Sequence, residues 1–128
     1  MSAMEQNFFD IAQLENSRKE SGRAYLEFLR VSSLSAGVYV LAAGSTDTQK
    51  PHREDEMYYV VRGRARMRIG GEAQAVTAGS VIFVAANVQH NFFEITEGLV
   101  VLVFFAPAES QVNVVSNYCA AASLPGIQ

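Results

Sequence analysis

The order of hydrophobic and polar positions divides the chain into a short helical stretch and a long β-rich region. Ile11 and Leu14 share one face of a helix predicted over residues 8–20. Asp10 can cap its first turn, and a Ser-Gly pair ends it. After this stretch the apolar runs are short, rich in β-branched and aromatic side chains, and separated by turn residues. The pattern therefore predicts an all-β fold with a short N-terminal helix.

Two neighbouring runs show most clearly which strand faces are buried. Residues 64–69 alternate between arginines, which we place toward water, and apolar residues, which we place toward the core. Residues 57–61 are apolar throughout, so we expect both faces of that strand to be covered. Gly63 predicts a turn between the two runs, and Gly70-Gly71 predicts a hairpin after them. The predicted strands are 25–31, 37–43, 57–61, 64–69, 72–76, 81–84, 90–95 and 99–105, the last two separated by a turn at 96–98.

About eight to ten short strands at such spacing are typical of an all-β sandwich or barrel. A chain of 128 residues accommodates one such domain, residues 1–128. We place its core at about 25–107 and a tail at 108–128 that wraps the body or a partner. A stripe of arginines is either an anion site or a solvated outer face, and we favour the outer face. The stripe consists of Arg62, Arg64, Arg66 and Arg68.

Composition and charge narrow the class of protein. A hydrophobic fraction of 49% with 18% charged residues describes a folded globular chain. A net charge of −3 gives no reason to expect nucleic acid or anionic lipid as a partner. The apolar runs are too short to span a membrane, and the N-terminus lacks the pattern of a signal peptide. Cys119 has no second cysteine to pair with, so we expect a small apolar filler in a cytoplasmic protein.

The densest candidate chemistry lies where one apolar strand begins. His52, Glu54 and Glu56 share strand parity, so an extended chain points all three the same way. The second of the two histidines, His90, opens a later strand. Carboxylates this close together repel one another. A divalent cation offsets this repulsion, because carboxylates and a neighbouring imidazole can coordinate it together. The alternatives are ordinary half-buried histidines and a solvated acidic run, although an unpaired Glu56 in an apolar strand would be costly.

With these stretches in view, the chain resembles the cupin superfamily of small jelly-roll barrels. The first cupin motif is glycine, five residues, His-x-His, three or four residues, glutamate, six residues and glycine. The second is glycine, five residues, Pro-x-Gly, two residues, histidine, three residues and asparagine. This chain keeps both spacings in order. The matching positions are Gly44, Lys50, His52, Glu56 and Gly63 in the first motif, and Gly79, Ala85, Asn87, His90 and Glu94 in the second.

The resemblance implies a double-stranded β-helix with His52, Glu56 and His90 as metal ligands and Glu54 as a candidate fourth. Lys50 departs from the motif, because it stands where the first histidine is expected. In an alternative register His52 takes that place and Glu54 takes the second. Lys50 is then either a surface residue or a charge near the cavity mouth. Two histidines and a carboxylate with open positions suit Fe, Mn, Ni or Zn, and the open positions would accept a bidentate small ligand, O₂ or water.

The resemblance further implies metal-dependent action on a small polar molecule, acidic or enolic, by a dioxygenase, isomerase or decarboxylase. No catalytic triad, phosphate loop or nucleotide motif is present in the sequence. The alternatives are a non-catalytic module that binds metal or a small ligand, and a metal-free sugar-modifying cupin. An open sheet edge, the apolar 57–61 strand and the tail favour a homodimer. Three aromatic residues either line the pocket or, as is usual, pack in the core: Tyr39, Tyr58 and Phe92.

Overall fold

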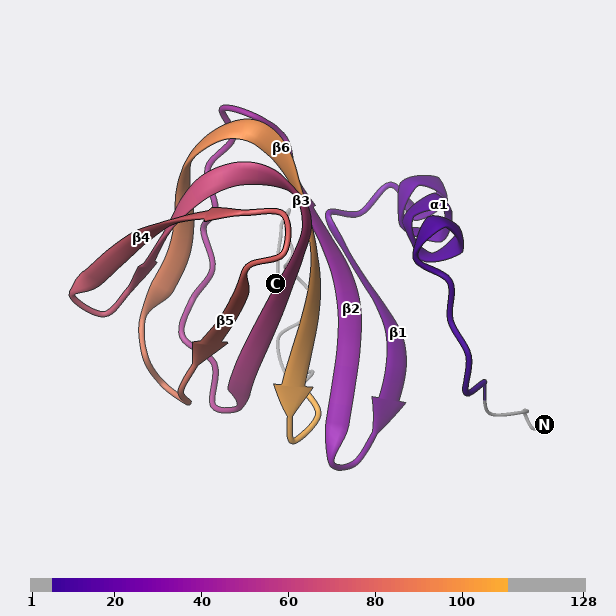
Figure 1. Cartoon of the computed structure of the whole chain (residues 1–128). Helices are drawn as coiled ribbons and strands as arrows, with labels where there is room; N and C mark the ends of the chain where they lie inside the picture. Colours follow the sequence, from indigo (N-terminus) through magenta and orange to yellow (C-terminus); the bar gives the residue numbers. More distant parts are fainter. Residues whose placement is uncertain (1–5, 111–128) are drawn as a thin grey trace.

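The computed structural model describes residues 6–110 and begins with the expected helix (Figure 1). Helix α1 spans Ile11–Ser21, and the side chain of Asp10 accepts a hydrogen bond from the backbone N–H of Gln13. Gly22 ends the helix in the left-handed conformation, with φ of 72°. Within the described residues, no helix is long and apolar enough to cross a membrane. The predicted tail beyond residue 110, with Cys119, lies outside the described part of the chain.

Six strands follow the helix and form one antiparallel sheet, which confirms the all-β fold. They pair in the order β1-β2-β6-β3-β4, and β5 pairs with the first half of β3. Figure 1 shows β3 and β6 arching side by side over the molecule, so the sheet has a concave inner face. The bounds are β1 Tyr25–Val31, β2 Leu34–Leu41, β3 Asp55–Ile69, β4 Glu72–Thr77, β5 Val81–Val84 and β6 His90–Ala106.

Two predicted turns were wrong, because Gly63 lies inside β3 and residues 96–98 lie inside β6. The two strands stay paired through this region, and shifts in register near Arg62 and Arg64 absorb the extra residues as bulges. Gly63 has φ of 111°, and a Cβ there would lie 2.3 Å from the carbonyl oxygen of Gly98. The glycine therefore permits a close approach of two bent strands, and each strand combines two of the predicted ones.

The core lies on the inner face of the sheet. Tyr58 and Phe92 are fully buried there, with ring centroids 5.1 Å apart in an edge-on contact. Alternation in the second half of β3 was predicted correctly, since Ala65 and Met67 are buried. Outside this face, Arg62 pairs with Glu15, Arg64 pairs with Glu97, and Arg66 and Arg68 lie over the ring of Phe93. The arginine stripe is thus an outer face, as expected.

The expectation that both faces of residues 57–61 are covered was wrong for the single chain. Met57 and Tyr59 are each 42% exposed, because they point away from the concave side. They pair with Phe83 and Val81 of β5, which are exposed as well. We refer to these four residues as the outer apolar face. It is unusual for a sheet to present such a run of large apolar side chains to water.

Candidate metal centre

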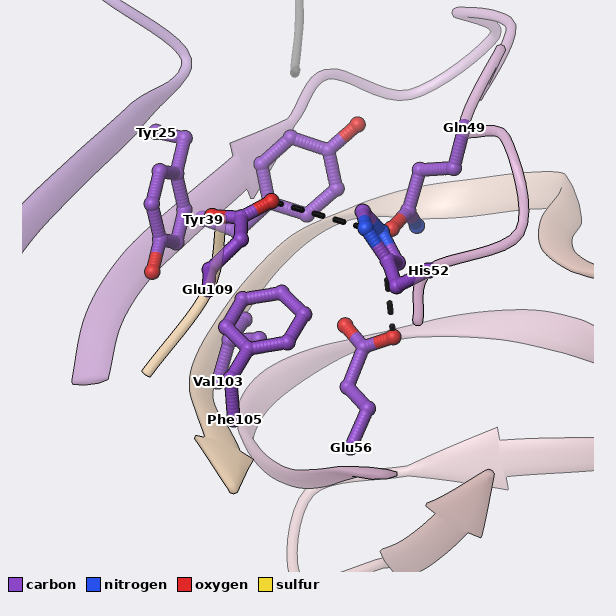
Figure 2. A pocket seen from close by; sticks show the side chains of 8 residues that line it. All are labelled: Tyr25, Tyr39, Gln49, His52, Glu56, Val103, Phe105 and Glu109. Atoms are coloured by element: carbon purple, nitrogen blue, oxygen red, sulfur yellow. Dashed lines mark ion pairs between the residues drawn. The ribbon is translucent and has the colours of Figure 1, made fainter. Parts of the chain in front are cut away.

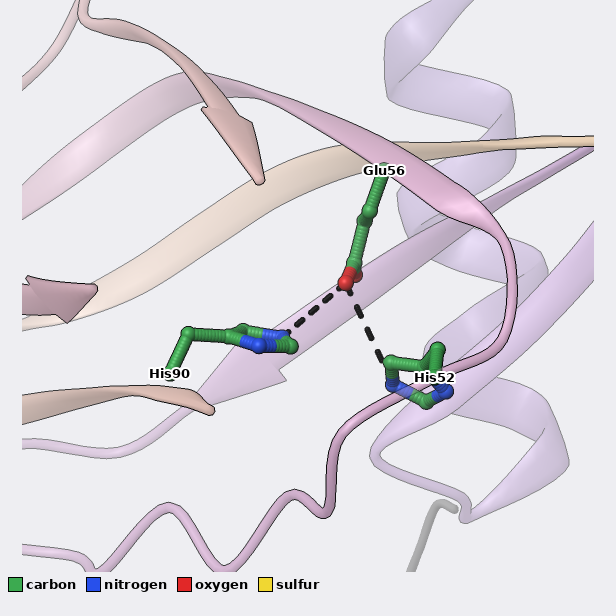
Figure 3. A group of neighbouring side chains, drawn as sticks. All are labelled: His52, Glu56 and His90. Carbon is green, nitrogen blue, oxygen red and sulfur yellow. Dashed lines mark ion pairs between the residues drawn. The ribbon is translucent and has the colours of Figure 1, made fainter. Parts of the chain in front are cut away.

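Three of the four predicted ligands converge on the inner face (Figure 3). One ligand atom each from His52, Glu56 and His90 lie within 4.8 Å of one another. His90 Nε2 is 3.0 Å from Glu56 Oε1, and His52 Nε2 is 3.9 Å from the same oxygen. The three side chains come from the loop before β3, the start of β3 and the start of β6. Segments far apart in the sequence therefore form one compact group.

Strand pairing fixes Glu56 and His90. Glu56 pairs with Val84 on one side and Phe105 on the other, so its side chain must point to the concave face, where it is 2% exposed. His90 pairs with Ile69 at the other end of β3 and is also 2% exposed. The two side chains meet because β3 bends between these pairs (Figure 1).

His52 lies outside the strands and is held by the loop of the second motif. Its carbonyl oxygen accepts a hydrogen bond from Asn87 N–H at 2.6 Å. Next to it, Asp55 Oδ1 accepts from Ala86 N–H at 2.9 Å. Asn87 stands where the cupin motif has glycine, and it adopts φ of 68°. Asparagine tolerates this left-handed conformation better than most residues, so the substitution preserves the turn that carries the contact.

The two imidazoles are oriented alike. His90 Nδ1 is 2.9 Å from the carbonyl oxygen of Val88, and His52 Nδ1 is 3.5 Å from Glu109 Oε2. In both rings Nε2 is the nitrogen that faces Glu56. An acceptor at Nδ1 favours the tautomer in which Nε2 carries a lone pair, as a metal ligand requires.

The centre contains polar atoms that the described residues leave unsatisfied. Both carboxylate oxygens of Glu56 and Nε2 of His90 are buried, and within residues 6–110 they have no hydrogen-bond partner beyond the contact that His90 Nε2 and Glu56 Oε1 make with each other at 3.0 Å. Such atoms cost free energy unless something else binds them, about 1–3 kcal/mol each and more for charged groups. A divalent cation would satisfy all three at once. Two imidazole nitrogens and one carboxylate fit Fe, Mn, Ni or Zn by their chemistry.

Burial and charge shift the pKa values around the centre. Burial lowers the pKa of His52, and the charge of Glu56 opposes this only in part. Burial also acts to lower the pKa of His90, but hydrogen bonding and charge from Glu56 outweigh it, so that pKa is raised. Burial and the neighbouring Glu56 and Glu54 raise the pKa of Glu109 to about 8. The crowded carboxylates thus make the pocket favourable for positive charge.

Glu54, the fourth candidate, lies apart from the group. Its side chain is buried, and Oε2 accepts a hydrogen bond from the backbone N–H of Ser110 at 2.9 Å. Lys50 is exposed, which favours its interpretation as a surface residue, and its neighbour Gln49 lines the pocket instead. The pocket beside the centre has an apolar wall and several polar side chains (Figure 2). Its lining residues are Tyr25, Tyr39, Gln49, His52, Glu56, Val103, Phe105 and Glu109.

Two residues that organise the pocket were not predicted from the sequence, Asp47 and Glu109. Asp47 is buried in the loop after β2 and accepts hydrogen bonds from Tyr39 Oη, the Phe92 N–H and Gln49 Nε2, each at 2.8 Å. Gln49 in turn accepts from Tyr58 Oη at 2.9 Å. One carboxylate in a polar loop carries no sequence signal of such a role. Glu109 lies beyond Pro107, where the regular pattern had ended.

Comparison with known proteins identifies the same family as the two motifs. The sequence pattern of the family described as cupin domain matches residues 37–105, more than half of the chain. The chain is a cupin. An uncharacterized protein of Streptomyces coelicolor is 50% identical over 102 residues, covering 80% of this chain and 97% of the relative. The resemblance drawn from the two motifs is thereby confirmed.

Solved structures agree on the fold of this cupin. A protein named TT1209 from Thermus thermophilus has a TM-score of 0.66 at 24% identity, covering 80% of this chain and 99% of its own. An RmlC-like cupin from Shewanella frigidimarina has a TM-score of 0.62 at 23% identity, covering 70% and 79%. At such identities the likeness shows the fold alone, a double-stranded β-helix. The role of the three converging residues as metal ligands stays a prediction.

Proposed function

We propose that this cupin binds a divalent metal through His52, Glu56 and His90. The observation that supports this most directly is the set of buried, unsatisfied atoms on Glu56 and His90, which face one another inside the barrel. A solvated acidic run would leave these atoms in water, and an ordinary core would give them hydrogen-bond partners besides each other. The metal is Fe, Mn, Ni or Zn, because the donor set is mixed nitrogen and oxygen.

The bound metal would supply Lewis acidity to a small ligand at its open positions. The residues of the pocket supply the rest of the recognition. Gln49 and Tyr25 offer polar groups, while Val103 and Phe105 offer an apolar wall. This combination suits a small polar molecule, acidic or enolic, that chelates the metal. We propose oxygenation, isomerisation or decarboxylation of such a molecule as the chemistry.

A second candidate is a non-catalytic module that holds the metal or a small ligand. The space left between the pocket side chains is about 10 Å³, room for one water molecule. A ligand of several heavy atoms therefore requires a wall side chain to move, whereas a water molecule does not. This observation favours a module that holds the metal alone for as long as the wall stays in place.

Elemental analysis of purified protein tests the metal site. We expect about one equivalent of a transition metal in the wild type and little in His90→Ala or His52→Ala, because each variant removes one ligand of three. Glu97→Ala, which removes an exposed carboxylate elsewhere, serves as the control. Equal metal content in the wild type and both histidine variants would rule out the site.

A thermal-shift screen separates the two candidates. Metal-loaded protein is heated with small mono- and dicarboxylic acids and enols, since a ligand that binds the folded state raises Tm. A shift that requires both metal and acid, and that is absent in His90→Ala, supports ligand binding at the metal, and consumption of that acid by the metal-loaded protein then supports the enzyme over the module. A shift with metal alone favours the module.

We also propose that the protein is a homodimer, with a second copy covering the outer apolar face. Met57 and Tyr59 of β3 lie beside Phe83 and Val81 of β5, and all four are large, apolar and exposed. A second copy offers the same surface, as a two-fold interface requires. Light scattering should give twice the chain mass, and Phe83→Lys should give the monomer. A monomeric wild type would contradict this. A cytoplasmic location stays a prediction from the single cysteine.

A further inference from the structure

The chain immediately after β6 is fixed across the pocket by its backbone. Ala108 N–H donates to the Ser32 carbonyl at 3.3 Å, and Glu109 N–H donates to Ser35 Oγ at 2.9 Å. The carbonyl oxygen of Glu109 accepts from the Arg30 guanidinium at 2.6 Å. Together with the bond from Ser110 N–H to the Glu54 carboxylate, these contacts attach residues 108–110 to β1, β2 and the loop before β3.

This attachment places the Glu109 side chain in the pocket wall, where its side chain is only 18% exposed. Its carboxylate faces Nδ1 of His52 at 3.5 Å, on the side of the ring opposite to Glu56 (Figure 2). His52 therefore lies between two carboxylates, with one nitrogen toward each. His90 also presents Nε2 to Glu56, but its Nδ1 faces the backbone carbonyl of Val88.

The two histidines differ in what else restrains them. His90 is part of β6, and its ring is almost completely buried. His52 belongs to a loop, and among the described contacts its backbone is tied to the second-motif loop by the bond from Asn87. A ring in a loop can rotate and can present either nitrogen, so an acceptor at Nδ1 is needed to select the ligating tautomer and orientation.

We propose that Glu109 is a positioning residue for the metal centre, which holds His52 with Nδ1–H toward the segment after β6 and Nε2 toward Glu56. The inference rests on the proposed metal site, and it adds a residue from outside both cupin motifs. The carboxylate does not need to touch the metal. It completes a carboxylate–histidine pair of the kind that orients metal-ligating imidazoles.

Zinc affinity tests the proposal. We expect Glu109→Ala to bind Zn(II) about 10–100-fold more weakly than the wild type, as is typical when the partner of a ligating histidine is removed. Glu109→Gln should recover most of the affinity, because its amide oxygen still accepts from Nδ1–H. Glu97→Ala removes the same type of side chain at an exposed site and should bind as the wild type does.

Imidazole NMR signals provide a readout that a general loss of packing would not reproduce. The chain contains only two histidines, so zinc-loaded, ¹⁵N-labelled protein gives one set of ring signals for each. Glu109→Ala should speed the solvent exchange of the His52 Nδ1–H and leave that of His90 unchanged, because Val88 still accepts from it. His90 is thus an internal control in the same spectrum.

The outcomes separate the two proposals. If the wild type does not bind Zn(II) or another transition metal, the metal site is wrong and this inference falls with it. If the wild type binds but Glu109→Ala and Glu109→Gln match it, with both Nδ1–H signals unchanged, only the role of Glu109 is overturned. Selective weakening in Glu109→Ala, with recovery in Glu109→Gln, supports it.

Discussion

The two halves of the candidate metal centre are built in different ways. Glu56 and His90 lie on strands, and the pairing of β3 with β5 and β6 determines where they point. His52 lies on a loop, and single contacts from Asn87 and Glu109 determine its position. A sheet distributes the constraint over many hydrogen bonds, while the loop concentrates it in a few side chains. We therefore expect the strand half, Glu56 and His90, to lose its arrangement only when the protein unfolds. The loop half, His52, can lose its position while the fold is kept.

The largest effect is expected from breaking the bend that brings the strand half together. Gly63→Ala would place a Cβ 2.3 Å from the Gly98 carbonyl oxygen, at a φ of 111° that alanine rarely adopts. We expect the free energy of unfolding to fall by roughly 3 kcal/mol, with loss of metal binding, because the strands must separate. Urea denaturation measures it. Gly71→Ala, where a Cβ meets no atom within 4 Å, is the matched control and should change little.

A smaller and more local effect is expected in the loop half. Asn87→Ala should lower the free energy of unfolding by about 1–2 kcal/mol, because alanine at φ of 68° is strained, and should weaken metal binding through His52. Asn87→Gly keeps the backbone N–H and removes the strain, so it should be close to the wild type in both. Calorimetry and metal titration check this. If Asn87→Ala matched the wild type in stability and in metal binding, the turn would not control the position of His52.

The most local effect, confined to one side chain, concerns pH in the metal-free protein. Burial and the neighbouring Glu56 and Glu54 raise the pKa of Glu109 from its ordinary value of 4.5 to about 8, so the folded state holds this proton more tightly than the unfolded state. Its stabilising contribution is full below pH 4.5 and is lost as the pH rises through 8. Glu109→Gln resembles the protonated form and should flatten that decline. Urea denaturation at several pH values measures both, and equal slopes would contradict the expectation.

The sequence predicted the strand half of the centre more fully than the loop half. Motif spacing identified His52, Glu56 and His90 alike, and strand parity predicted only that His52, Glu54 and Glu56 point the same way. The same parity argument grouped Glu54 with His52, although Glu54 binds the Ser110 N–H and lies outside the three converging residues. Parity holds only within a strand, and β3 begins at Asp55.

The errors in the predicted fold have a common cause. Glycine permits both turns and bulges, so Gly63 alone does not distinguish a chain reversal from a bend in a continuous strand. The choice depends on whether β6 follows β3 through the bend, which is a property of the partner strand. Likewise, an apolar run indicates that both faces are buried, yet a single chain leaves Met57 and Tyr59 exposed. Phe104, which pairs with Met57, is likewise only half-buried.

The amino-acid sequence by itself determined the fold class, the cupin family and the residue types of the candidate centre, because periodicity and motif spacing are local and survive without coordinates. Only the tertiary structure decided which nitrogen of each histidine faces Glu56 and which residue supports His52. Those features depend on contacts between positions such as 52 and 109, whose separation leaves no pattern along the chain. The bend of the paired strands β3 and β6 and the course of the chain after β6 bring these residues into contact.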